Sequence, residues 1–86
     1  MAEYKLLKPI QKVDGSKIEV VEIKEDFDGN DIEKIGNTVG DGTILNTIVA
    51  CAINQSLTVV RNMSGRDIKK IAEIAKGFLD DGENPA

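Results

Sequence analysis

A short motif that occurs twice constrains this chain most, because it marks where two helices begin. Residues 27–35 and 63–71 share Gly, Asp, Ile, Lys and Ile in register, 36 residues apart. In the second copy, Ser64 is placed to cap the first turn, and Asp67 to accept a hydrogen bond from the N–H of the cap. The first copy carries an aspartate at both of these positions. The motif therefore predicts two capped helix starts.

Ahead of the first motif, the sequence predicts a β-hairpin. Residues 4–10 and 18–23 are short runs rich in Leu, Ile and Val. Between them lies Asp14-Gly15, which is a strong turn signal for a hairpin. Pro9 has no N–H to donate to a neighbouring strand, so we expect the first strand to lie at an edge or to end at this residue.

Three helices are expected after the hairpin. The first begins near Asp28 and ends around Gly36 or Val39. The second covers about 43–57, where apolar residues recur with a helical period. The third covers about 65–79 and is amphipathic.

The predicted fold class is α+β, with an N-terminal β-hairpin followed by a short, an apolar and an amphipathic helix. We expect the 86 residues to form a single domain, 1–86, with an ordered core over about 4–79 and a frayed acidic tail over 80–86. Residues 42–60 carry no charge, which predicts a helix that is buried or faces a partner. Their apolar run at 48–53 is far shorter than the ~20 residues of a membrane span, so no membrane partner is expected.

The composition does not favour catalysis or nucleic-acid binding. Histidine is absent, which removes the commonest general base and a common metal ligand. The single cysteine, Cys51, lies among apolar residues and is expected to be a packed, inert thiol. We therefore expect no enzyme activity and no catalytic, cofactor-binding or metal-binding residues. The net charge of −4 argues against a nucleic-acid partner, because phosphates require a basic surface.

Charge is concentrated in two blocks of opposite sign. Residues 18–33 contain seven acidic residues and one lysine, a net charge of −6. Residues 59–79 contain five basic and two acidic residues, a net charge of +3. The acidic block is suited to cover a basic partner, as a small acidic antitoxin or regulatory binding protein does.

Five short stretches, taken in order, carry a resemblance to a known family. They are Leu7-Lys8-Pro9-Ile10 with Asp14-Gly15 and Ile18 after it, Val21-Glu22-Ile23, Gly29-Asn30-Asp31-Ile32, Met63-Ser64-Gly65-Arg66-Asp67-Ile68 and Gly77-Phe78-Leu79. Over about residues 5–79, the chain resembles in these stretches the small tail assembly chaperones of contractile, Mu-like bacteriophages. Family members often have a proline ahead of the first helix start, where this chain has Glu25-Asp26-Phe27.

The resemblance implies a non-enzymatic protein in the cytoplasm of a bacterial host. Such chaperones bind the tape measure protein, a very long and largely helical chain, and keep it soluble. They are thought to recruit tail tube subunits during assembly and to be absent from the finished tail. This chain is therefore expected to bind tape measure and tail tube proteins and to be missing from the mature virion.

A small domain with an uncharged helix can have apolar surface left to cover, and such a surface suits a helical client. We expect five apolar residues either to dock the client or a second copy of the chain, or to close the core of the monomer. A structural minor tail or connector subunit of the virion is the alternative from a different class. The five residues are Leu57, Val59, Val60, Phe78 and Leu79.

Overall fold

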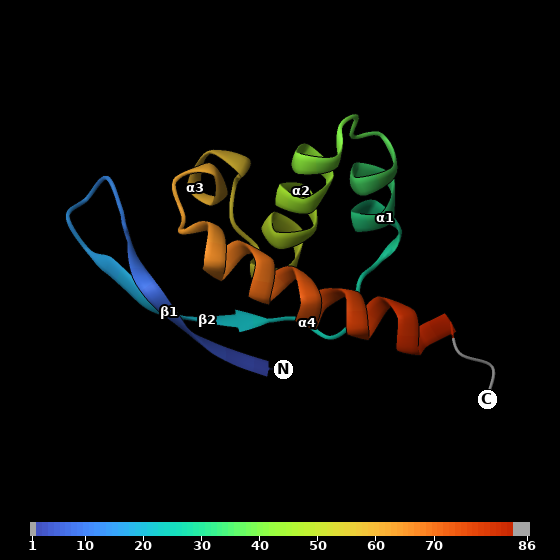
Figure 1. The fold of residues 1–86 in the computed structure, drawn as a ribbon, viewed down its shortest axis with the longest axis horizontal. Coiled ribbons are helices and arrows are strands. Elements are labelled where there is room, and N and C mark those ends of the chain that lie inside the picture. The colour runs from blue at the N-terminus through green and yellow to red at the C-terminus, as the bar shows by residue number, and fades with distance from the viewer. Residues whose placement is uncertain (1, 84–86) are drawn as a thin grey trace.

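We describe the fold from a computed structural model, which covers residues 2–83, with side chains described as far as residue 79. Figure 1 shows the hairpin along one side of the molecule, α4 crossing its middle, and the other three helices in a row beyond α4. The predicted α+β class, with a hairpin ahead of the helices, is confirmed. The described elements are β1 (Ala2–Gln11), β2 (Lys17–Ile23), α1 (Gly29–Gly36), α2 (Asp41–Ile53), α3 (Leu57–Arg61) and α4 (Gly65–Glu83).

The second predicted helix is two helices in the structure. α2 ends at Ile53 because Asn54 adopts the left-handed conformation, with φ 55°, that Asn tolerates better than most residues. The hydroxyl of Ser56 then accepts the N–H of Val59 and caps α3. The apolar pattern continues through this break, so the helical period over 43–57 did not reveal it. The described chain therefore has four helices where three were predicted.

The last helix is also longer than predicted. α4 begins at Gly65, as the motif indicates, but it continues to Glu83 instead of ending near Leu79. The first part of the expected 80–86 tail is therefore helical, and residues 84–86 lie outside the described residues.

Gly77 lies within α4, and a Cβ added there would meet no neighbouring atom within 4 Å. We therefore expect Gly77→Ala to raise the free energy of unfolding by about 0.5–1 kcal/mol, because Ala has the higher helix propensity. Urea denaturation measures the change. Gly15→Ala is a control that should lower the free energy of unfolding, since Gly15 has φ 90°, which strains any residue with a Cβ. A loss of stability in Gly77→Ala would show that this position does not tolerate a methyl group.

The ladder between β1 and β2 is antiparallel and is interrupted in the middle. Lys5 pairs with Val20, whereas Ile10 pairs with Ile18, so the intervening residues 6–9 of β1 face a single residue of β2. Such an interruption bends a strand and changes which side chains face inward. Accordingly, Val20 is exposed although Ile18, two positions earlier, packs against the core.

Pro9 lies within this interruption, where its missing N–H breaks no ladder hydrogen bond. β1 continues past it to Gln11, so the strand is an edge strand, as expected, but does not end at the proline.

The predicted turn is confirmed. Gly15 has a positive φ, and the Asp14 carboxylate accepts the N–H of Ser16 at 2.9 Å.

The core lies between one face of the hairpin and the helices α2 and α4. Residues 47–53 of α2 are all buried, so the central part of the uncharged segment is buried. None of the helices within residues 2–83 has both the length and the apolar character that a membrane span requires. The buried residues from the hairpin and α4 include Leu6, Ile10, Val21, Ile23, Ile68, Ile71, Ala72 and Ala75.

Candidate functional site

The five predicted partner-binding residues lie in two separate places. Leu57, Val59 and Val60 belong to α3, whereas Phe78 and Leu79 belong to the later turns of α4. Along the axis of α4, at about 1.5 Å per residue, its start lies roughly 20 Å from Phe78. Figure 1 places α3 near the start of α4 and far from its C-terminal end. The structure therefore does not bring the five residues together into one surface.

Their exposure also differs. Val60 is 0 % exposed and belongs to the core, so its side chain is not on the surface. Leu57, Val59 and Phe78 are half-buried and pack against the core. Leu79 is half-buried as well. For Val60, the alternative role of closing the core is the one that the structure supports.

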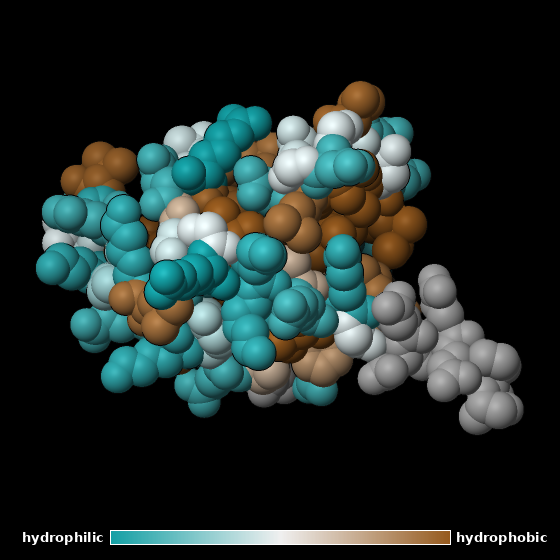
Figure 2. Space-filling model, viewed as in Figure 1, coloured by the Kyte–Doolittle hydropathy of each residue, from teal (hydrophilic) through white to brown (hydrophobic). Residues whose placement is uncertain are grey.

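A shallow apolar pocket of about 470 Å³ lies between α2 and α4. Its lining includes Ile44, Leu45 and Ile48 from α2, with Lys76 from α4 at the side. Ile44 and Leu45 are only partly buried. Figure 2 shows hydrophobic residues gathered on the same side of the molecule, over α1 and α2. This pocket could not be predicted from the sequence, because the helical period does not separate its residues from the fully buried ones of α2.

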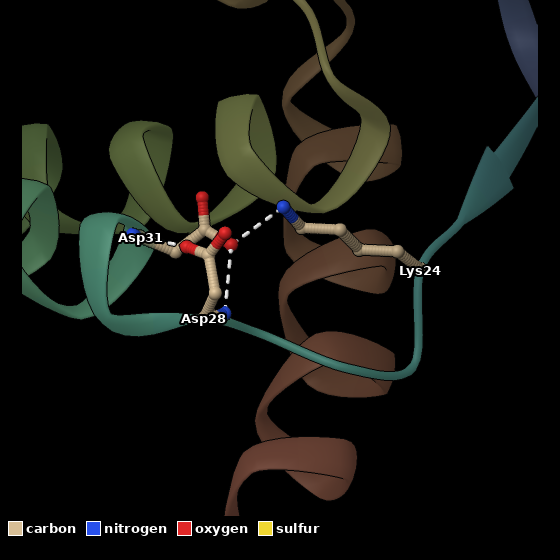
Figure 3. A network of polar contacts seen from close by, with 3 residues as sticks. All are labelled: Lys24, Asp28 and Asp31. Carbon is tan, nitrogen blue, oxygen red and sulfur yellow. Dashed lines mark hydrogen bonds and ion pairs between the residues drawn. The ribbon is translucent and has the colours of Figure 1, made fainter.

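Lys24, Asp28 and Asp31 form a polar network at the start of α1 (Figure 3). The Asp31 carboxylate accepts the N–H of Asp28 at 3.2 Å, and the Asp28 carboxylate accepts the N–H of Asp31 at 3.0 Å. This reciprocal pair is the capping box predicted for the first motif. Lys24, which follows β2, forms an ion pair with the same Asp31 carboxylate. The network therefore ties the start of α1 to the end of the hairpin.

The pKa values of Lys24, Asp31 and the nearby Cys51 all move away from neutral pH. Burial raises the pKa of Asp31, but the hydrogen bonds from Lys24 and the Asp28 N–H outweigh it and leave the pKa below its usual value. The hydrogen bond to Asp31 raises the pKa of Lys24. Burial, together with the nearby Asp31 carboxylate, raises the pKa of the Cys51 thiol. These three shifts do not tune Lys24, Asp31 or Cys51 to act as an acid or base near neutral pH.

We expect Asp31→Asn to cost about 1–3 kcal/mol at pH 7, because it removes a charge-assisted hydrogen bond and leaves Lys24 without its partner. The pKa of Asp31 is lower in the folded than in the unfolded chain. Its stabilising effect is therefore full above the unfolded pKa, near 4, and is lost as the pH falls through the folded pKa. The stability gap between wild type and variant should shrink in acid. Urea unfolding at pH 7 and at about pH 3 tests this, and an equal gap at both values contradicts it.

The second motif uses its aspartate differently from the prediction. Asp67 is 0 % exposed and accepts hydrogen bonds from the N–H of Leu7 at 2.9 Å, the N–H of Lys8 at 3.1 Å and the Tyr4 hydroxyl at 3.0 Å. Ser64 precedes α4, but within residues 2–83 its hydroxyl accepts no hydrogen bond. The predicted second capping box is therefore wrong, because this carboxylate holds the interrupted stretch of β1 instead.

Within the described part of the chain, no three His, Cys, Asp or Glu side chains are grouped as a metal ion would require. Cys51 is buried, as expected of a packed thiol. The chain matches no family model, no curated protein and no solved structure.

Proposed function

We propose that the protein is a non-enzymatic assembly chaperone of a contractile bacteriophage tail. It binds the tape measure protein in the cytoplasm of the bacterial host and recruits tail tube subunits. Two things support the proposal: the order of the motifs along the chain, and the partly exposed apolar surface that lies between α2 and α4. The apolar surface is the structural observation that supports the proposal, because a chaperone of this kind acts only by contact.

The pocket between α2 and α4 suits a helical client. An amphipathic helix presents apolar side chains every three or four residues along one face, and such a face seats in a shallow apolar hollow. Ile44 and Leu45 form the accessible apolar part of the pocket. Of the two predicted binding residues on α4, Leu79 lies three residues after Lys76 and so on the same side of the helix, whereas Phe78 does not. We infer that Ile44, Leu45 and Leu79 bind the client.

Co-production with the tape measure protein of the same phage or prophage tests the proposal. Wild-type protein should keep the tape measure protein in the supernatant after centrifugation, and Leu45→Glu should lower the soluble amount by about fivefold or more. Leu57→Glu is the matched control, because Leu57 is also half-buried but lies on α3. Thermal melts establish that both variants are folded. If the tape measure protein is equally soluble when it is co-produced with the wild type and with folded Leu45→Glu, the proposed surface is wrong.

Mass spectrometry of purified particles separates the chaperone from a structural minor tail or connector subunit. A chaperone should be missing from mature virions, whereas a structural subunit should be present in a fixed ratio to the other tail proteins. Finding the protein at such a ratio would contradict the proposed function.

A further inference from the structure

A groove of about 510 Å³ lies between the turn end of the hairpin and α3, and we call it the hairpin groove. Apolar residues line both of its walls, with Ile10, Val13 and Ile18 from the hairpin and Val59 from α3. Val13 is fully exposed, and Ile18 and Val59 are only half-buried. Apolar surface in the hairpin groove is therefore open to solvent, and it includes Val59, one of the five predicted binding residues.

The hairpin groove is positively charged. Its charged lining residues are Lys8 and Lys12, and among the described residues no carboxylate lines it. The two segments that form its walls, residues 8–18 and 55–62, contain four basic residues and one acidic residue, a net charge of +3. The acidic one, Asp14, accepts local hydrogen bonds within the turn. The hairpin groove therefore favours an occupant that combines apolar and acidic side chains.

The chain itself contains a segment of this kind. Residues 77–83 include three acidic residues and no basic one, and they begin with Gly77-Phe78-Leu79. Phe78 is half-buried, so part of it remains exposed on α4. It does not lie on the side of α4 that carries Lys76 and borders the proposed client pocket. Phe78 is therefore available to a partner other than the client.

One molecule cannot place this segment in its own hairpin groove. The groove lies beside α3, which ends four residues before α4 begins. Residue 78 is 13 residues further along α4, which corresponds to roughly 20 Å at about 1.5 Å per residue. Figure 1 shows the hairpin turn and α3 at one end of the molecule and the last turns of α4 at the other. The segment that fills the groove therefore has to come from a second copy.

We propose that copies of this protein associate head to tail, with residues 77–83 of one copy in the hairpin groove of the next. Phe78 contacts the apolar lining around Val59, and the acidic residues after it are attracted by Lys8 and Lys12. So short a segment makes a small contact, and we expect a Kd between about 10 μM and 1 mM. This contact goes beyond the proposed function and does not depend on it.

Sedimentation equilibrium of the full chain measures the association. The average mass should rise above that of the monomer as the protein concentration approaches about 1 mM in about 0.05 M salt. The rise should be smaller in about 0.5 M salt, because salt screens the attraction between the acidic segment and the lysines. A protein that stays monomeric at every concentration in low salt overturns the proposal.

Lys8→Glu combined with Lys12→Glu reverses the charge of the hairpin groove and should weaken the association by about tenfold or more. Lys5→Glu combined with Lys34→Glu is the matched control, because it changes the net charge equally at two lysines that do not line the groove. The control should alter the association by less than about twofold. All four lysines are exposed, so both variants should stay folded, which thermal melts check. Equal losses in the two variants would indicate unspecific attraction and overturn the proposal.

Asp80→Lys combined with Asp81→Lys reverses the charge of the acidic segment and should weaken the association as strongly as the change in the groove. A variant with both pairs of changes should associate again, because an acidic groove then meets a basic segment. Failure of this variant to recover overturns the proposal. Association that survives the reversal of the segment also overturns it, and would assign the contact to the other acidic stretch, residues 18–33. None of these measurements involves the tape measure protein, so this proposal and the proposed function can fail separately.

Discussion

Asp67→Ala should lower the free energy of unfolding by about 3–5 kcal/mol, the largest loss that we expect from one substitution. The variant removes one acceptor and leaves the N–H groups of Leu7 and Lys8 and the hydroxyl of Tyr4 without it. The Asp67 side chain is fully buried, so water does not easily take the place of its carboxylate. Because small domains are stabilised by about 5–15 kcal/mol, the variant should unfold at a much lower urea concentration.

Two milder variants show how much each part of this hydrogen-bonded group contributes to the stability lost in Asp67→Ala. Tyr4→Phe removes one of the three donors and should cost about 1 kcal/mol. Asp67→Asn keeps a carbonyl oxygen as an acceptor and should fall between Tyr4→Phe and Asp67→Ala. A loss below about 1 kcal/mol in Asp67→Ala would mean that the carboxylate does not hold the interrupted part of β1.

Ile71→Ala should cost about 2–5 kcal/mol, because it opens a cavity in the centre of the core. Ile71 is 0 % exposed and is among the largest fully buried side chains of the described chain. It lies on the buried stripe of α4, which packs against α2 and the hairpin. Urea denaturation of the variant measures the loss, and an unchanged slope with denaturant indicates that the folded state stays compact.

Ile32→Ala is the matched control for Ile71→Ala. Both isoleucines lie in helices, so the small gain in helix propensity from Ala is common to both substitutions. Ile32 is 51 % exposed, and its substitution should change stability by less than about 0.5 kcal/mol. Equal losses at the two positions would mean that burial does not explain the cost at Ile71.

The two copies of the motif illustrate what could be predicted from the sequence. The capping box of Asp28 and Asp31 is closed by residues three positions apart, so local chemistry was enough to predict it. Asp67 has the same local setting, but its donors lie about 60 residues earlier in the chain. A bond between such distant residues leaves no trace in local spacing, so it appeared only in the structure.

Other differences have similar causes. The break after α2 had a local signal in Asn54 and Ser56, but the apolar residue Leu57 continued the helical period and concealed it. The five predicted binding residues were chosen for apolar character, and exposure is decided by tertiary packing. The fully buried Val60 therefore could not be separated from its half-buried neighbour Val59 by sequence alone.

The hydrogen bonds to Asp67 also set an order of events during protein synthesis. The donors at Leu7 and Lys8 are made about 60 residues before their acceptor. At 5–20 residues per second, the ribosome needs roughly 3–12 s to reach Asp67 after it has passed β1. Throughout this interval the middle of β1 lacks the group that fixes its shape. The nascent hairpin therefore completes its structure only after the ribosome has synthesised Asp67, long after both of its own strands have been made.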